Sequence, residues 1–315
     1  MKNQRLKGTL LLLIASVIWG FAFVAQSAGM QSVGPFTFQA SRMLLAVLVL
    51  LPVAGTVHLL RKKRDLNPQP FLSPRLLWRA AISGVFLFVA SSFQQVGMLY
   101  TTVGHAGFLT SLYLLIIPLL GLFLGRRLPL RIWICILLAL AGLWALCMTE
   151  EGFSLGRGDV MMLLAALFFS FQILSLDLLS KRFDGVQYST VQMLTAGLLS
   201  LVCTFLFEAP SLAGIQSAAL PIAYAGILSC GVAYTFQVLG QRHTHPAVAS
   251  ILMSLEGVFA VLGGALLLRE IPSLSEGIGC LLMFAATLLS QLEGSGEKKK
   301  RSAVPSEGAA TEKQE

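Results

Sequence analysis

The sequence predicts an all-α membrane protein with about ten transmembrane helices, arranged as two inverted five-helix repeats. The first observation is composition: 56% of the 315 residues are apolar and only 12% are charged, whereas a soluble domain has about 25% charged residues. The second is that nearly uncharged runs of about 20 residues recur, each long enough to cross a hydrocarbon layer of about 30 Å. The third is that the second half of the chain repeats the first.

The expected helices are joined mostly by short connections that contain glycine, proline or charged residues, so neighbouring helices should run antiparallel. The apolar runs lack the alternating pattern of a membrane β-barrel. We do not expect a signal peptide, because the first span has a counterpart in the middle of the chain. The approximate limits of the spans are 8–28, 36–58, 77–99, 104–125, 130–149, 158–181, 187–207, 216–240, 246–268 and 273–292.

The internal repeat has two registers. The stretch Phe93–Pro129 matches Phe236–Pro272 at a shift of 143 positions, with a Phe-Gln pair, a Ser-Leu pair and two glycines among the identical residues. A shift of 150 positions aligns the beginnings of the halves, for example Gly8 with Gly158. The difference of seven residues falls in a longer loop around Arg61–Pro74. Two long related halves indicate a duplicated domain rather than an array of short repeats.

The basic residues lie mainly on one side of the expected membrane. With the N-terminus placed inside, the inner loops and tails contain nearly all of the 23 Lys and Arg residues. Only Arg157 and Arg269 lie outside, and Arg42 lies within a span. This is the positive-inside pattern of a multi-pass protein of the cell membrane with both termini in the cytoplasm. The net charge of +8 is explained by this topology and does not indicate a nucleic-acid partner.

Each half contains an odd number of spans, so the second half should enter the membrane with opposite polarity. Inverted repeats are typical of secondary transporters, in which the substrate site lies near the bilayer midplane where the halves meet. We therefore expect a first repeat at 8–149 and a second at 158–292. A disordered basic and polar cytoplasmic tail should follow at 293–315.

Several blocks of sequence match the pattern of a known family. They are Ile18–Gly20, Gly107–Leu112, Ala249–Ala260 and Gly263–Glu270. From about Gly8 to Leu292 the chain resembles the drug/metabolite transporter superfamily, specifically its ten-span members with two EamA-type domains. This resemblance implies a carrier that moves small metabolites, often amino acids, outward across the cytoplasmic membrane.

Glu256 is the first candidate functional residue, because it is the one charged residue within 246–268. A charge at the bilayer centre costs about 2.5–3.5 kcal/mol on insertion scales, so a functional role is the default hypothesis. Small residues on the same helix face, such as Ala260, would let a substrate or a neighbouring helix approach. We expect Glu256 to bind a substrate amine, to couple protons to transport, or both. The structural alternative is a protonated acid that bonds to another helix.

Arg42 is the second candidate. It lies seven residues beyond Pro35, where its span begins, and therefore about 10 Å deep at 1.5 Å per residue. Its guanidinium suits a substrate carboxylate, but it can equally extend to the outer headgroups. Together, Arg42 and Glu256 suit a zwitterion such as an amino acid.

Six polar or aromatic residues within the spans are further candidates for substrate binding. Gln94 and Gln237 are equivalent in the repeat, and a buried amide in lipid needs a partner, so they line a cavity or bond between helices. Tyr113 can stack on a substrate and is equivalent to Glu256, although aromatic residues in spans more often pack or lie at the interface. The complete set is Trp19, Gln39, Gln94, Tyr113, Gln172 and Gln237.

Other chemistries have no support in the sequence. The five cysteines are scattered through apolar spans, the histidines do not form a ligand pattern, and there is no phosphate-binding loop. We therefore expect no enzyme activity, no cofactor and no metal. The expected partners are a small-molecule substrate and the lipid bilayer, and a homo-oligomer is allowed but not required.

Taken together, these features predict a secondary transporter that works by alternating access and exports amino acids or related metabolites. Proton exchange and facilitated diffusion both fit. The alternative is efflux of lipophilic cations, as in small multidrug members of the same superfamily, although those have a membrane glutamate in the first helix and the first span here has none. An intramembrane enzyme is a weaker alternative, because the spans contain no candidate nucleophile or metal cluster.

Overall fold

The computed structural model describes residues 2–64, 70–123, 125, 128–147, 156–269 and 274–291. Within these ranges every regular element is a helix, which confirms the all-α fold. Eight helical segments are long and apolar enough to cross a membrane. Two shorter apolar stretches, Leu130–Gly142 and Gly277–Ala286, lie where the fifth and tenth spans were expected. The tail expected at 293–315 is outside the described residues.

The helices follow the expected order along the chain. The first half contains α1 (Lys2–Gly29), α2 (Pro35–Lys63), α3 (Pro74–Gly97), α4 (Val103–Thr110), α5 (Tyr113–Phe123) and α6 (Leu130–Cys147). The second half contains α7 (Arg157–Leu179), α8 (Gly185–Phe207), α9 (Leu212–Ser217), α10 (Ala219–Ala223), the π-helix η1 (Tyr224–Ala233), α11 (Tyr234–Gln241), α12 (Pro246–Met253), α13 (Leu255–Gly263), the π-helix η2 (Gly264–Leu268) and α14 (Leu274–Gln291).

The fourth and ninth expected spans are each interrupted near the middle. The fourth consists of α4 and α5, and the ninth of α12 and α13 followed by the π-helix η2. A serine lies at each break: the Ser111 hydroxyl donates to Gly107 O at 2.8 Å, and the Ser254 hydroxyl donates to Ile251 O at 2.9 Å. Such bonds to the preceding turn compete with the helical hydrogen bonds and bend the helix. The two serines are equivalent at the shift of 143, so the repeat places both breaks at the same position.

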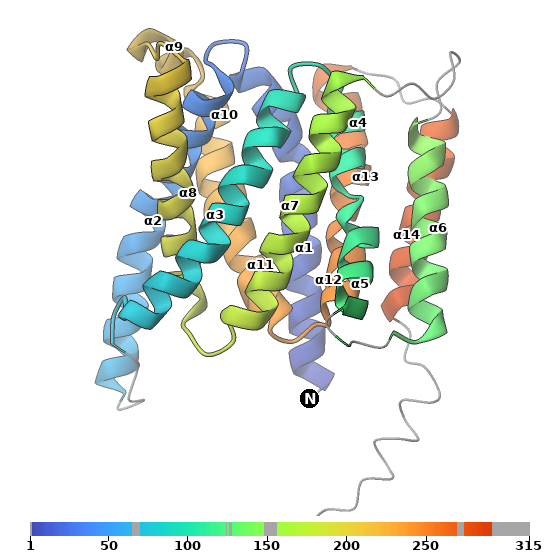
Figure 1. The fold of residues 1–315 in the computed structure, drawn as a ribbon, viewed down its shortest axis with the longest axis horizontal. Helices are drawn as coiled ribbons and strands as arrows, with labels where there is room; N and C mark the ends of the chain where they lie inside the picture. The colour runs from blue at the N-terminus through green and yellow to red at the C-terminus, as the bar shows by residue number, and fades with distance from the viewer. Residues whose placement is uncertain are drawn as a thin grey trace, which may run out of the picture.

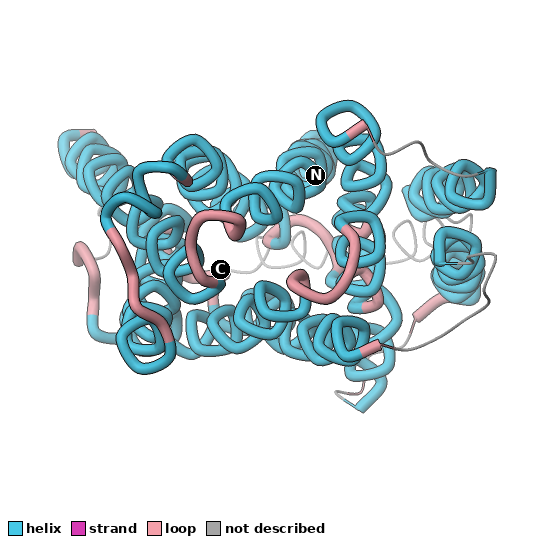
Figure 2. The backbone as a smooth tube through the Cα atoms, turned by 90° about the horizontal axis from the view of Figure 1, so that it is seen from above, coloured by secondary structure: helices cyan, strands magenta, loops and turns pink. Residues whose placement is uncertain are grey.

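The helices stand side by side in an elongated bundle (Figure 1). α2 and α8 lie at one end of the long axis, and α6 and α14 lie together at the other, as the view from above also shows (Figure 2). Between these pairs, α1 packs on α13 and α11, and α3 packs on α7. Extended contacts therefore join the two halves along the whole bundle.

Helices at equivalent positions of the halves run antiparallel where they meet. The start of α2 contacts the end of α8 through Thr37 and Glu208, and its other end contacts the start of α8 through Arg61 and Asp184. The end of α6 contacts the start of α14, where the hydroxyl of Ser275 donates to the carbonyl of Ala145. The first helices of the halves are also opposed in Figure 1, since α1 ascends from the N-terminus and α7 descends.

Glu208 closes the N-terminal end of α2. Its carboxylate accepts from the backbone N–H groups of Phe36 and Thr37 at 2.8 Å and from the Thr37 hydroxyl at 2.6 Å. The N-cap of α2 is Gly34, which has no side chain to perform this role. A Cβ at Gly34 would lie 2.3 Å from the carboxyl carbon of Glu208. The repeat equivalent of Gly34 is Asp184, which instead caps α8 with its own carboxylate.

Glu208→Ala is expected to destabilise the protein by about 1–2 kcal/mol, as loss of a helix cap does. Gly34→Ala should also destabilise the protein, because the backbone at Gly34 (φ −67°) accepts alanine and the collision with Glu208 is the main obstacle. In the Glu208→Ala background, Gly34→Ala should be nearly neutral. Thermal unfolding of the four proteins in detergent measures this coupling. Equal effects of Gly34→Ala in both backgrounds would show that the cap is not formed as described.

Candidate functional site

A cavity of about 440 Å³ lies between the two halves, where α1, α2, α3, α7, η1, α11 and the divided fourth and ninth spans come together. Its wall combines aromatic and apolar side chains with a small number of buried polar ones, which is typical of a small-molecule site. The lining residues are Trp19, Phe23, Gln26, Arg42, Gln94, Thr110, Tyr113, Phe169, Ile173, Ser229, Tyr234, Gln237, Met253 and Glu256.

Most of the cavity wall consists of residue pairs that are equivalent in the internal repeat. At the shift of 150 or 143 positions these pairs are Trp19 and Phe169, Phe23 and Ile173, Gln94 and Gln237, Thr110 and Met253, and Tyr113 and Glu256. Both copies of the duplicated unit thus contribute the same positions to one space. Four lining residues, Gln26, Arg42, Ser229 and Tyr234, have no lining counterpart.

Glu256 lies at the start of α13, directly after the break in the ninth span, and only 5% of its surface is exposed. The Tyr113 hydroxyl donates a hydrogen bond to its Oε1 at 3.0 Å. Next to this bond, the Ser111 hydroxyl lies 3.3 Å from the Ser254 carbonyl oxygen. Each of these two contacts joins residues that are 143 positions apart, so the two copies meet at equivalent positions beside the carboxyl group.

Small residues allow the two divided spans to approach closely at this point. A Cβ at Gly107 of α4 would lie 2.8 Å from the Cβ of Ala260 and 3.5 Å from the Cα of Gly257, both in α13. Small residues let helix backbones approach in this way within membranes. The close crossing of α4 and α13 brings Tyr113 within reach of Glu256.

Arg42 lies in α2 and is also directed to the cavity, with 4% of its surface exposed. Its guanidinium carbon is 5.8 Å from the centre of the Phe38 ring. Its Nε is buried and has no hydrogen-bond partner among the described residues. Of the two positions expected for this side chain, the structure places it in the cavity rather than at the surface of the bundle.

Two more buried polar atoms of lining residues lack a partner in the described chain, Nε1 of Trp19 and Oε1 of Gln26. The Trp19 ring packs against the ring of Tyr234, with centroids 4.8 Å apart and an angle of 61° between the planes. An unpartnered buried polar group costs about 1–3 kcal/mol. A bound molecule that pairs with these groups would remove that cost.

The amide pair Gln94 and Gln237 lines the cavity from α3 and α11. Nε2 of Gln94 donates to Oγ1 of Thr110 at 3.3 Å. Gln237 instead exchanges hydrogen bonds of 3.2 and 3.4 Å with Gln172 of α7. Both lining amides are therefore held in place by a neighbour in their own half.

Two of the residues predicted to bind substrate are not on the cavity wall. Gln172 lies behind Gln237 and holds it. Gln39 is fully buried between α2, α3 and α8, where its Nε2 donates to Ser200 Oγ at 3.0 Å and to Phe88 O at 3.3 Å. Both amides are bonded in the helix packing, which is the alternative that the sequence had left open, while Oε1 of Gln39 has no partner among the described residues.

Eight lining residues were not predicted: Phe23, Gln26, Thr110, Phe169, Ile173, Ser229, Tyr234 and Met253. The internal repeat could have indicated two of them. Phe169 is equivalent to the predicted residue Trp19. Met253 is equivalent to Thr110, which lies three positions before the predicted residue Tyr113. Ser229 reaches the cavity from the π-helix η1, and nothing in the sequence indicates that helix. In the part of the chain that the structure describes, no cluster of three His, Cys, Asp or Glu residues could hold a metal ion.

Cysteine substitution tests the position of the cavity. In a variant whose five cysteines are replaced by serine, Ser229→Cys should react with a small water-soluble thiol reagent, because Ser229 lines the cavity. Ser200→Cys is the matched control, since Ser200 is equally buried but bonded to Gln39 away from the cavity. The measurement is the labelling rate of each thiol in proteoliposomes. Equal rates would contradict the cavity wall described above.

Comparison with known proteins agrees with the fold and the repeat. The model of the EamA-like transporter family matches residues 6–148 and again 156–292. An "uncharacterized transporter" of Archaeoglobus fulgidus is 28% identical over 294 residues, covering 92% of this chain and 87% of that protein. The "uncharacterized transporter YoaV" of Bacillus subtilis is 22% identical, covering 90% and 96%.

A crystal structure of a protein that is 21% identical covers 94% of this chain and 99% of its own, with a TM-score of 0.73, which shows a shared fold. The family match extends over nearly all of the described chain and includes every residue of the cavity wall. This chain therefore belongs to the EamA-like transporter family and is a multi-pass membrane transporter.

Proposed function

We propose that this transporter works by alternating access and exports amino acids or related zwitterions across the cytoplasmic membrane, with both termini in the cytoplasm. The main support is that a buried guanidinium and a buried carboxyl group line one cavity. In the described chain neither Arg42 nor Glu256 forms an ion pair. Burying a charge without a partner is costly in protein and in lipid. A zwitterionic substrate would supply a carboxylate to Arg42 and an ammonium group to Glu256.

The lining of the cavity fits this substrate class. The aromatic rings of Trp19, Phe169 and Tyr234 offer an apolar surface for a side chain beside the two charged groups. Export, rather than uptake, is the direction that the family resemblance implies.

The proposed inversion of the two halves is supported by the antiparallel pairing of α2 with α8 and of α6 with α14. It is also supported by the equivalent residues that meet beside Glu256. Inverted repeats allow each half to adopt the conformation of the other, which opens the central site to one side and then to the opposite side. The cavity lies between the halves, where such a movement has its effect.

Glu256 is the proposed site of proton coupling. Its hydrogen bond with Tyr113 can form whether the carboxyl group is charged or neutral, because the phenol is the donor. A substrate ammonium group would favour the charged form, and its departure would favour the neutral form. Binding of substrate and of a proton would therefore be mutually exclusive at this residue.

Efflux of lipophilic cations is the second candidate, favoured by the aromatic wall around Glu256. The guanidinium of Arg42 in the same cavity opposes it, since a second cation would be repelled. This difference allows one substitution to separate the two substrate classes.

Glu256→Gln is expected to reduce transport by roughly tenfold or more, equivalent to about 1.4 kcal/mol, and to abolish the response to an imposed pH gradient. The assay is uptake of a metabolite panel into proteoliposomes at two opposite pH gradients. Asp177→Asn is the control, because Asp177 is also buried but pairs with Lys181 at 2.7 Å outside the cavity. Asp177→Asn should keep the pH response. An unchanged rate and pH response in Glu256→Gln would refute the coupling role.

Arg42→Gln should selectively lose substrates that have a carboxylate, whereas the amides of the same compounds should be transported as before. Arg42→Lys should recover part of the activity, because it restores the charge but not the two-pronged geometry of the guanidinium. Competition between amino acids and their amides in proteoliposomes measures this selectivity. If Arg42→Gln instead gains transport of a quaternary ammonium dye while amino acids are never substrates, cation efflux is the correct function.

A further inference from the structure

A second pocket, of about 580 Å³, shares no lining residue with the central cavity. The chain segments that line it lie at the end of the bundle where the N-terminus is located (Figure 1). They are the last turns of α2, the segment before α3, the first turn of α3, the loop between α7 and α8, and the first turn of α8. Three cationic side chains line it, Arg61, Lys181 and Arg182, together with His58. Asp184 is the one carboxylate among its described lining residues.

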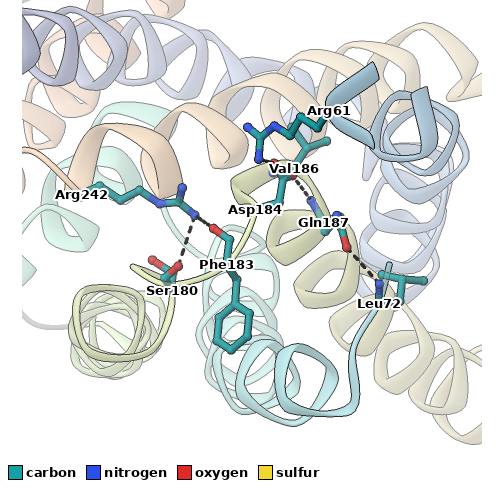
Figure 3. Close-up of polar contacts among 8 residues, drawn as sticks. All are labelled: Arg61, Leu72, Ser180, Phe183, Asp184, Val186, Gln187 and Arg242. Carbon is teal, nitrogen blue, oxygen red and sulfur yellow. Dashed lines mark hydrogen bonds and ion pairs between the residues drawn. The ribbon is translucent and has the colours of Figure 1, made fainter. Parts of the chain in front are cut away.

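The charge of Asp184 is already balanced within the protein. Its Oδ2 is 2.8 Å from the Arg61 guanidinium, and its Oδ1 accepts from the N–H groups of Val186 and Gln187 at 3.0 and 3.1 Å (Figure 3). Lys181 also has a carboxylate partner, Asp177. Arg182 is exposed and forms no ion pair in the described chain. Among the described lining residues, the positive charge of Arg182 therefore remains after the internal pairs are formed.

The walls of the pocket are fixed by bonds between separate segments. The side chain of Gln187 accepts a hydrogen bond from the N–H of Leu72 at 3.0 Å, and Arg242 donates to the carbonyls of Ser180 and Phe183 (Figure 3). Leu72 has a φ of +49°, a conformation that costs a non-glycine residue about 1–3 kcal/mol and is found mainly where the surrounding structure imposes it. These bonds fix the positions of the segments that line the pocket relative to one another.

The cations keep enough exposure to reach a ligand. About half of each side chain is accessible for Arg61 and Lys181, at 50% and 52%. Nδ1 of His58 is buried and has no hydrogen-bond partner among the described residues, and its ring packs 5.4 Å from that of Phe71. Arg182 is unpaired in the described chain, and Arg61 and Lys181 have further N–H donors beyond their bonds to Asp184 and Asp177. Together they suit an anionic group with several acceptor oxygens.

Large apolar side chains are exposed in the same helical turns that form the pocket. Leu59 and Leu60 are exposed and lie between His58 and Arg61 on α2. Trp78 lies in the first turns of α3 with 71% of its surface exposed. Tryptophan is enriched where membrane proteins meet the headgroup region. A ligand with a charged head and hydrocarbon chains matches this arrangement better than a small soluble anion.

We propose that this pocket binds the phosphate of an anionic phospholipid headgroup, with the acyl chains on the apolar surface of α2 and α3. Basic pockets between transmembrane helices are known to bind such headgroups. The ligand would bridge α2, α3 and the α7–α8 loop, and so would join the two halves of the transporter at this end. A free phosphate ion shares the same headgroup chemistry and must be distinguished by experiment.

The test measures the melting temperature of the purified protein in detergent against added phosphatidylglycerol, phosphatidylcholine with the same acyl chains, or inorganic phosphate. We expect phosphatidylglycerol to stabilise the protein, and the other two to do so weakly. Arg182→Gln should raise the half-saturating phosphatidylglycerol concentration by roughly fivefold, and Lys181→Gln with Arg182→Gln by roughly 30-fold. Arg182→Gln alone is the variant with least effect on folding, because it breaks no ion pair of the described chain.

Lys62→Gln is the matched control, since it removes one exposed positive charge from the same end of α2 without lining the pocket. It should shift the half-saturating concentration by less than about twofold, because an exposed charge without a direct contact to the ligand contributes little. Equal weakening by Lys62→Gln and Arg182→Gln would overturn the pocket, because only the general surface charge would then matter. Equal stabilisation by phosphatidylcholine, or by inorganic phosphate at comparable concentration, would overturn the assignment to an anionic lipid. None of these outcomes depends on transport, so they are separate from the tests of the central site.

Discussion

A polar group within a hydrocarbon layer must be bonded to protein or face a water-filled space, because an unsatisfied group there costs several kcal/mol. This constraint explains where many polar side chains of the transporter lie. Ser83 of α3 bonds to Ser175 of α7 and Tyr188 of α8, and so fixes the contact between three helices. Arg42 and Gln26, by contrast, leave polar atoms unpartnered beside the central cavity. Bonded polar residues hold the bundle together, whereas Arg42 and Gln26 are two of several buried polar groups without a partner in the described chain, and these two line the cavity.

The meeting of Tyr113 with Glu256 shows how duplication generates a site. The two residues are equivalent in the repeat. If the halves are related by an approximate two-fold axis and one of the two residues lies near that axis, the other must lie near it too. The breaks at Ser111 and Ser254 occur directly before them and let the side chains leave the regular helical path. Duplication therefore places equivalent positions opposite each other at the centre, and later substitution can make them chemically different. Here a phenol faces a carboxyl group.

The sequence predicted those properties that depend on the length of the apolar runs and on the internal repeat. The all-α membrane fold, the approximate spans and the alignment of Tyr113 with Glu256 all follow from the apolar runs and the repeat register. It could not decide between packing and lining for the glutamines, because both environments require a buried amide with a partner. Gln39 is bonded among α2, α3 and α8, whereas Gln94 reaches the cavity, and only the rotation of each helix about its axis separates these outcomes. Tyr234 follows a π-helix whose extra residue per turn shifts the lining face, and this shift has no signature in the apolar pattern.

The departures from symmetry have a consequence for substrate affinity. If the two halves were identical, a two-fold rotation would convert the inward-open state into the outward-open state. The two states would then have equal energies and equal affinities for the substrate. The two halves contribute different residues to the cavity wall, so this equality does not hold. Arg42 lines the cavity, while its repeat equivalent, Gln192, is buried and does not. Glu256 of the second half likewise corresponds to Tyr113 of the first half. Each of the two charged groups is therefore present in only one half. In the proposed mechanism a substrate therefore meets its carboxylate partner from the first half and its ammonium partner from the second. In that proposal, movement of the halves would change the two contacts unequally, so the affinities for substrate on the two sides of the membrane would differ, while the gradient that drives transport sets its net direction.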